Sequence, residues 1–165
     1  MDTVTPARRS EIMARIRSKN TTPELAVRRY LHASGLRYRL HHHRLPGRPD
    51  LIFPGRLLCV FVHGCFWHSC PRCRHGARAV KSNTSYWSAK LARNKVRDAD
   101  NQKRLAALGW NVLTIWACQA ADPAALRSLA ASIHALPSTR RSSSPARAKA
   151  ASAAGPSPPE APLRS

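Results

Sequence analysis

Apolar residues recur along residues 1–136 with two spacings, one typical of helices and the other of short strands. Helical spacing, with start and stop residues at its ends, predicts helices over residues 8–17, 21–35, 84–108 and 122–136. Short apolar runs bounded by turn residues predict extended segments over residues 38–41, 50–53, 57–62 and 111–116. Helices before and after such strands predict an α/β fold with a mixed central sheet and helices on its faces.

Local signals support two of these elements. Residues 21–24, Thr-Thr-Pro-Glu, combine three features of a helix start. They are a hydroxyl cap, a proline in the first turn and an acid at the positive end of the helix dipole. Pro54 and Gly55 separate two apolar runs, which predicts a β-hairpin. We therefore expect the strands over 50–53 and 57–62 to pair.

The predicted long helix has one face that changes character along its length. Residues spaced by four, three and four positions share this face: Trp87, Leu91, Asn94 and Asp98. The stripe is apolar at its start and polar at its end. We expect the helix to face the core with one end and a functional site with the other.

Composition divides the chain at residue 137. Residues 137–165 hold six Pro, seven Ser and seven Ala and no aromatic residue, so they cannot bury enough apolar surface to offset their ordering entropy. We expect residues 1–136 to form one domain and residues 137–165 to be a disordered basic tail. The tail contributes only +4 to the net charge of +20, so the body carries +16.

This charge indicates the class of partner. A strongly cationic body attracts polyanions, so nucleic acid is the first partner to consider. The longest unbroken apolar run is residues 57–62, far short of the roughly 20 residues that span a bilayer, and no apolar signal peptide opens the chain. We expect neither a membrane protein nor a secreted one, and the five cysteines then indicate metal or thiol chemistry rather than a disulfide frame.

The body has only seven acidic residues, so the positions that hold one are informative. Asp50 follows the segment Leu-Pro-Gly-Arg-Pro and begins an apolar strand, where a lone carboxylate has no structural task. Many Mg²⁺-dependent nucleases present a metal ligand in this way, because Mg²⁺ prefers hard oxygen ligands. An exposed turn acid paired with Arg48 is an equal alternative on spacing alone.

Two histidines follow the next predicted strand. His63 lies at the strand end near Asp50. The unperturbed pKa of a histidine side chain lies near neutrality, which suits a general base. His68 lies five residues further on, where it could face the same phosphate or complete a metal site. Glu24 and Asp98 have simpler explanations, since Glu24 caps a helix and Asp98 can pair with neighbouring basic residues on a solvated surface.

Three cysteines lie within nine residues, and a fourth follows the last predicted strand. Soft ligands at this spacing suit a closed tetrahedral Zn²⁺ site. The candidates are Cys65, Cys70, Cys73 and Cys118. His75 is an alternative to Cys73 or Cys118 as a ligand, whereas Cys59 lies inside an apolar run and is expected to be a plain core residue.

The loop that zinc would pin carries two large aromatic residues, Phe66 and Trp67. Such residues either fold back into a small satellite core or contact a partner. Beside a strongly basic body, insertion between DNA base steps is the favoured interpretation. Trp110 and Trp116 flank the last strand and are expected to belong to the core.

Taken together, these residues resemble the very short patch repair (Vsr) DNA mismatch endonucleases. The resemblance runs in order over about residues 8–120 and rests most on the string His-Gly-Cys-Phe-Trp-His-Ser-Cys-Pro at residues 63–71. Leu-Pro-Gly-Arg-Pro-Asp at 45–50, Asn-Thr-Ser-Tyr-Trp at 83–87 and Leu-Gly-Trp-Asn-Val-Leu at 108–113 also match. The resemblance implies a restriction-endonuclease-like α/β fold with three layers and a structural zinc site.

The same resemblance implies an activity and its requirements. It implies nicking of double-stranded DNA on the 5′ side of the thymine in a T:G mismatch, which arises when 5-methylcytosine deaminates. Mg²⁺ would be the catalytic cofactor and Zn²⁺ the structural one. It further implies a bacterial-type cytoplasmic monomer, with mismatch-repair proteins and a DNA-cytosine methyltransferase system as candidate partners.

Roles follow from the resemblance by position. Asp50 would hold Mg²⁺ together with the backbone carbonyl of Val62. His63 would be the general base, and His68 would assist at the phosphate or the leaving group. The acids that would orient metal-bound waters and the histidines are Glu24 and Asp98. The four cysteines would hold zinc, and the residues that would insert beside the mismatch or contact DNA are Phe66, Trp67, Trp87, Met13, Ile16 and Asn94.

Two departures from the family pattern leave alternatives open. Histidine is often among the zinc ligands of the family, whereas all four candidates here are cysteine, so His75 stays open as a ligand. Position 62 is Val where a threonine can occur, which matters little if only its backbone is used. A restriction-type nuclease that cuts matched DNA and a zinc-stapled DNA-binding module without catalysis are the alternative functions.

Overall fold

The central β-sheet combines antiparallel and parallel pairs. The computed structural model of the chain describes residues 5, 8, 11, 19–40, 42–78, 80 and 83–138, and the sheet lies within them. Its strands, in spatial as well as chain order, are β1 (Arg39–Leu40), β2 (Leu51–Phe53), β3 (Leu58–His63) and β4 (Asn111–Trp116). The pairs β1–β2 and β2–β3 are antiparallel, whereas β3 and β4 are parallel. The predicted mixed sheet is therefore confirmed.

A tight turn joins β2 to β3. It consists of the 3₁₀ helix η1 (Pro54–Arg56) and of Leu57, which takes a left-handed φ of 45°. Phe53 then pairs with Leu58 across the turn. The predicted hairpin is confirmed, and β3 begins one residue later than expected because Leu57 completes the turn.

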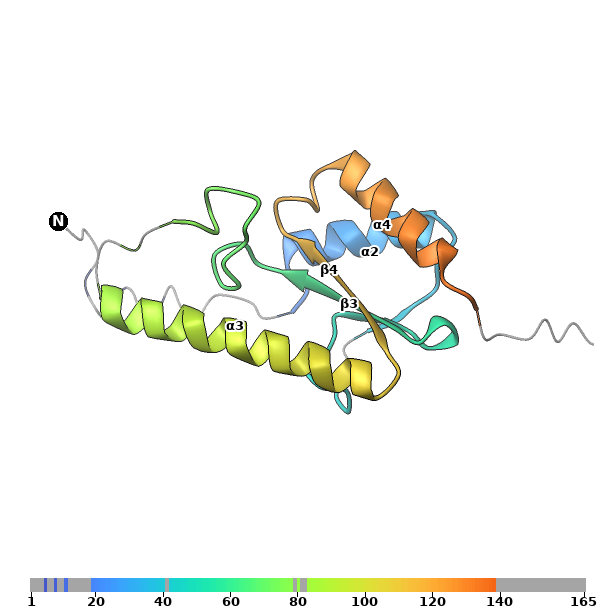
Figure 1. Cartoon of the computed structure of the whole chain (residues 1–165). Helices are drawn as coiled ribbons and strands as arrows, with labels where there is room; N and C mark the ends of the chain where they lie inside the picture. The colour runs from blue at the N-terminus through green and yellow to red at the C-terminus, as the bar shows by residue number, and fades with distance from the viewer. Residues whose placement is uncertain are drawn as a thin grey trace, which may run out of the picture.

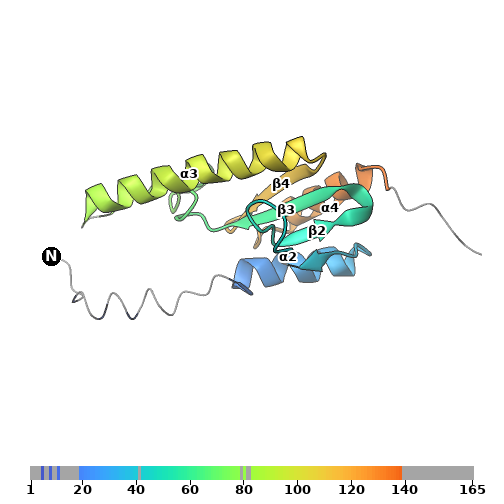
Figure 2. The same ribbon diagram turned by 90° about the horizontal axis from the view of Figure 1, so that it is seen from below.

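Helices cover both faces of the sheet (Figures 1 and 2). They are α2 (Thr22–Ala33) and α4 (Pro123–Ala135) on one face and α3 (Thr84–Ala107) on the other. Because side chains alternate along a strand, Leu58 and Val60 join the core beneath α2 and α4, while Cys59 and Phe61 face α3. His63 continues the second series and therefore emerges on the α3 side of the sheet.

The helices begin and end where the sequence signals them. The Thr21 N–H donates to Glu24 Oε2 at 3.3 Å in the first turn of α2, and Asp122 accepts the Ala124 N–H at 2.9 Å at the start of α4. Gly109, with a φ of 79°, follows α3. These contacts satisfy backbone groups that a helix end otherwise leaves without partners.

The 24-residue helix α3 extends well past the sheet and runs beside the loop that follows β3 (Figure 1). Trp87 and Leu105 are its buried residues, and Leu91, Asn94 and Asp98 lie half-buried between them. The predicted shared face is therefore present, but the expectation that its apolar start faces the core is wrong. The core contact comes from Leu105, beyond Asp98, whereas Trp87 packs on Phe66 and Trp67. Within the part of the chain that the structure describes, no helix is both long and apolar enough to cross a membrane.

Two predictions fall largely outside the described residues. Of the predicted helix over 8–17, the structure describes Arg8 and Glu11, which are helical and form an ion pair at 2.8 Å. Met13 and Ile16 lie outside the described residues, as does the predicted tail beyond residue 138.

Candidate active site and cysteine cluster

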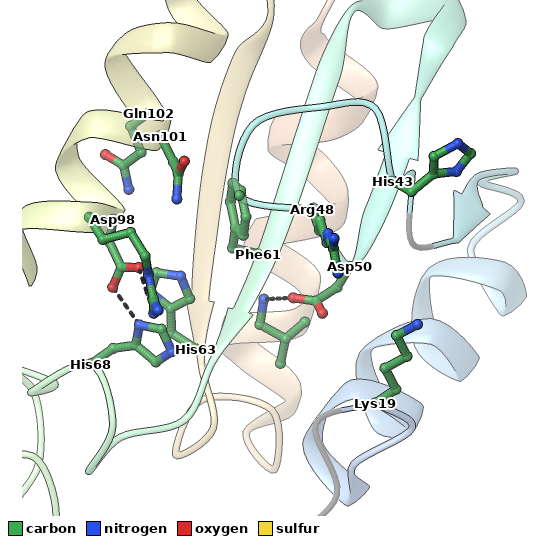
Figure 3. Close-up of a pocket in the computed structure, with 13 residues that line it drawn as sticks. Lys19, His43, Arg48, Asp50, Phe61, His63, His68, Asp98, Asn101 and Gln102 are labelled. Atoms are coloured by element: carbon green, nitrogen blue, oxygen red, sulfur yellow. Dashed lines mark hydrogen bonds and ion pairs between the residues drawn. The ribbon is translucent and has the colours of Figure 1, made fainter. Parts of the chain in front are cut away.

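A pocket of about 670 Å³ lies on the α3 side of the sheet, where β3 ends (Figure 3). It brings together four of the five predicted catalytic residues, which come from the start of β2, the end of β3, the following loop and α3. The residues that line it are Lys19, His43, Gly47, Arg48, Asp50, Phe61, Val62, His63, His68, Arg97, Asp98, Asn101 and Gln102.

Asp50 is fixed against the backbone of β3. The β2–β3 register pairs Leu51 with Val60, so Asp50 lies beside the next residues of β3. The Val62 N–H donates to Asp50 Oδ2 at 2.7 Å. A carboxylate offers about four acceptor positions, so this bond is compatible with a cation or water on the same group.

His63 is 8% exposed and is surrounded by rings. It stacks on His68, with ring centroids 4.0 Å apart and planes inclined by 11°, and meets the edge of Trp116 at 5.5 Å. Burial, followed by the neighbouring His68 and Arg97, lowers the pKa of His63 to about 4, although Asp98 acts in the opposite direction. Near neutral pH this imidazole is therefore uncharged and can accept a proton. Trp116 is half-buried and belongs to neither core, so its predicted place in the core is wrong; it packs against His63 instead.

Asp98 holds the second histidine. His68 Nδ1 lies 2.5 Å from Asp98 Oδ2, whereas Arg97 Nη2 is 3.8 Å from the other carboxylate oxygen. The Asp98 side chain is 18% exposed, so a solvated pair with neighbouring basic residues does not describe it. An Nδ1–H donated to the carboxylate leaves Nε2 of His68 to face the pocket.

These three side chains are better arranged for handling protons than for binding one ion together. Ligand atoms of His63, His68 and Asp98 all lie within 4.8 Å of one another, which is close enough for a metal. The lone pair of an imidazole nitrogen lies in the ring plane, however, and two nearly parallel rings 4.0 Å apart cannot both direct it at one ion about 2.1 Å away.

Glu24 is not among the residues that line the pocket. It is 2% exposed and forms an ion pair with Arg28, besides its bond to the Thr21 N–H. Arg28 Nη1 also donates to Asn20 Oδ1 at 2.7 Å, next to the pocket residue Lys19. The contacts of Glu24 therefore tie the start of α2 to the segment at the pocket rim.

The four predicted cysteine ligands converge on one point. Their sulfur atoms all lie within 4.8 Å of one another, and the Cys70 and Cys118 sulfurs are 3.9 Å apart. A tetrahedron with Zn–S bonds of about 2.3 Å has edges of about 3.8 Å, so the donor set fits zinc. A hydrogen bond from the Gly76 N–H, against partial desolvation, lowers the pKa of Cys73 to about 7, which favours the thiolate that binds metal.

His75, the alternative zinc ligand, and Cys59, the fifth cysteine, both lie outside the group of converging sulfur atoms. His75 approaches Cys73 through its backbone N–H, and the group of converging ligand atoms contains Cys73 rather than the His75 ring. Cys59 is fully buried in the core that faces α3, where desolvation raises its pKa to about 12. Its predicted place in the core is confirmed.

An aromatic cluster lies between the cysteines and α3. Phe66 meets Trp67 at 5.3 Å and Trp87 at 5.5 Å between ring centroids, and Trp67 lies 5.7 Å from Trp87. Asn94 Nδ2 donates to the Trp67 carbonyl oxygen at 2.9 Å, which fixes the loop backbone to α3. Phe66 and Trp67 are half-buried here, so the rings cover one another without joining the main core.

Sequence reasoning missed several positions in both sites. A Cβ on Gly76 would lie 2.0 Å from the Cys70 carbonyl oxygen, so only glycine fits beneath the cysteine loop. No local pattern reveals this close approach. Asn101 and Gln102 line the pocket, and extending the stripe on α3 by three residues beyond Asp98 would have found Asn101.

Comparison with known proteins adds a family match. The family model described as DNA mismatch endonuclease Vsr matches residues 1–74. The type II nicking enzyme V.XorIIP of Xanthomonas oryzae pv. oryzae is 48% identical over 130 residues, which cover 77% of this chain and 92% of that protein. The type II nicking enzyme V.NmeAIP of Neisseria meningitidis is 38% identical over 128 residues, covering 76% and 89%. The DNA mismatch endonuclease Vsr of Escherichia coli K12 is 36% identical over 115 residues, covering 68% and 70%.

We predict that the purified protein contains stoichiometric zinc and that replacing Cys70 by serine removes it. Loss of one of four soft ligands should weaken zinc binding by more than about 100-fold, since even outer residues around a metal contribute 10- to 100-fold. Elemental analysis, with Co²⁺ absorption as a second readout of thiolate ligation, measures this.

Two further variants make the test specific. Cys59→Ala removes a buried cysteine outside the cluster and should keep zinc, and His75→Ala should keep it as well. Full zinc content in Cys70→Ser, or its loss in His75→Ala, would contradict the set of four cysteines.

Proposed function

Because this chain belongs to the Vsr family of DNA mismatch endonucleases and is thus a DNA-nicking endonuclease, we propose that it nicks duplex DNA 5′ to the T of a T:G mismatch in a Mg²⁺-dependent reaction. The observation that carries the proposal is the convergence of Asp50, His63, His68 and Asp98 on one pocket. We also propose that the sheet and its two helical layers form a restriction-endonuclease-like fold.

Asp50 and the backbone carbonyl of Val62 would hold the magnesium ion. Both are hard oxygen donors, and the bond from the Val62 N–H already keeps the carboxylate of Asp50 at this backbone. Bound there, Mg²⁺ would supply positive charge to the phosphate that is attacked. The cysteine cluster would hold Zn²⁺, which pins the loop carrying Phe66, Trp67 and His68.

The histidines would move the protons of the reaction. Neutral His63 accepts a proton from the attacking water as its oxygen bonds to phosphorus. One bridging P–O bond breaks, and protonated His68 stabilises the departing oxygen or gives it a proton. Asp98 holds His68 in the orientation that this step needs. Glu24 would act from outside the pocket, through Arg28 and the segment beside Lys19.

Recognition of the mismatch would use the aromatic cluster. Phe66 and Trp67, supported by Trp87, would enter the stack of bases beside the mismatch, since apolar side chains inserted between base steps open and kink a duplex. The positive charge of the body supports binding to the backbone of DNA.

Wild-type protein with Mg²⁺ should place one nick 5′ to the mismatched T in end-labelled duplexes with randomised flanks and leave the C:G parent intact. Asp50→Ala should bind the mismatched duplex but nick it at least about 100-fold more slowly, because the metal ligand is lost. Equal cutting of both duplexes by the wild type would instead indicate a restriction-type nuclease. Binding without any cutting would indicate a DNA-binding module.

Asp98→Asn should lower the single-turnover nicking rate by about 100-fold or more while DNA affinity stays close to that of the wild type. An amide cannot stabilise protonated His68 as a carboxylate does, and acid–base catalysis typically contributes 10²- to 10⁴-fold. Asp100→Asn, an exposed acid on the same helix, is the matched control and should nick normally. Equal rates for the two variants would remove Asp98 from the mechanism.

Replacing Phe66 and Trp67 together by alanine should reduce the preference for mismatched over matched duplex by about 10-fold or more, because base–aromatic stacking contributes about 1–3 kcal/mol per base. Competition binding measures this preference. Trp110→Phe is the control: it changes a ring that packs on the core facing α3, so this variant should keep the preference for mismatched duplex. Full preference in the double variant would refute insertion.

A further inference from the structure

We propose that Arg48 binds a phosphate of the DNA strand beside Asp50, an inference that rests on the nicking function proposed above. Figure 3 shows that the two sides of the pocket differ. His63, His68 and Asp98 stand on one side, and Arg48 stands with Asp50 on the other. A phosphate placed between two carboxylates needs cationic partners from the protein as well as from the metal.

The backbone holds Arg48 in an unusual conformation. Gly47 has a φ of 72° and Arg48 a φ of 51°, so two successive residues are left-handed. Glycine adopts this region readily, whereas the Cβ of arginine is crowded there. Pro49 follows and is fully buried, which fixes the chain before Asp50. Disfavoured backbone conformations cluster at functional sites, and here the turn holds a long cationic side chain at the pocket.

Contacts on two sides anchor this turn. The Arg48 N–H donates to the Leu45 carbonyl oxygen at 3.1 Å, and Leu45 packs against the core that faces α3. Gly47 lies against α3, because a Cβ at this position would be 3.0 Å from Asn101 Nδ2. Asn101 follows Asp98 by about one helical turn. The backbone at Arg48 is therefore held by the core beneath Leu45 and by α3 at Asn101.

The chemistry of the side chain fits a phosphate. Guanidinium presents a planar fork of donors that can bind two phosphate oxygens at once, which the point charge of lysine cannot do. Arg48 is exposed and lines the pocket, so DNA can reach it. Arg44 belongs to the same loop and is also exposed, but it is not among the lining residues. It is thus a matched control.

The test combines variants with a scan of the DNA backbone. Neutral methylphosphonates replace, one at a time, the phosphates around the expected nick in a T:G duplex. One such replacement should slow nicking by the wild type about 10- to 100-fold, the range for a lost charge-assisted hydrogen bond. Arg48→Ala should lose a similar factor on natural DNA and then be insensitive to that methylphosphonate. Arg44→Ala should behave as the wild type.

Two more variants separate charge from backbone shape. Arg48→Gly suits the left-handed turn, so it should fold at least as stably as the wild type yet nick as slowly as Arg48→Ala. Arg48→Lys should recover part of the rate. Full activity of the glycine variant would overturn the proposal. So would a scan in which each methylphosphonate slows Arg48→Ala by the same factor as it slows the wild type.

The design also distinguishes failure of the activity itself. If the wild type nicks neither duplex, the proposed function fails. The same scan read by equilibrium binding still tests Arg48, since its contact with phosphate does not require cleavage. Equal binding losses in the wild type and Arg48→Ala at every position would then reject the contact.

Discussion

Both candidate sites depend on the register of strand β3. It pairs antiparallel with β2 at one edge and parallel with β4 at the other, so its position is set from both sides. A shift by one residue would turn His63 away from α3 and into the opposite core. The same pairing sets the Ala117 N–H against the His63 carbonyl oxygen at 2.8 Å, and the next residue, Cys118, donates its N–H to the Cys65 sulfur at 3.3 Å. The pocket and the cysteine cluster are thus built on one strand end.

The charge of the chain creates a second constraint. A net charge of +20 attracts DNA, but it also surrounds every carboxylate with cations that could draw it from its place. Asp50 and Asp98 are each held by a short directional bond, from the Val62 N–H and from His68. Such bonds depend on geometry and are screened far less by salt than distant charges are. The body can therefore be cationic overall while its site acids keep fixed orientations.

Features with local causes could be predicted from the sequence, and features with distant causes could not. The capped start of α2, the hairpin and the three clustered cysteines at 65, 70 and 73 each follow from a few neighbouring residues. The stacking of His63 on His68 and the bond from His68 to Asp98 depend on how the loop after β3 lies against a helix thirty residues away. The need for glycine at position 76 arises from the Cys70 backbone beneath it, which no pattern in the sequence reveals.

The loop after β3 is firmly held at its backbone and loosely held at its rings. Cys65 and Cys70 fix it within the cysteine cluster, and Asn94 bonds to the carbonyl oxygen of Trp67. The rings of Phe66 and Trp67 contact one another and Trp87, and Lys90 Nζ lies 5.6 Å from the centroid of the Trp67 ring. Ring contacts of this kind can be exchanged for stacking on bases at modest cost, because both are aromatic contacts of similar strength. Insertion into DNA would therefore require the side chains to turn while the loop, and His68 with it, keeps its place.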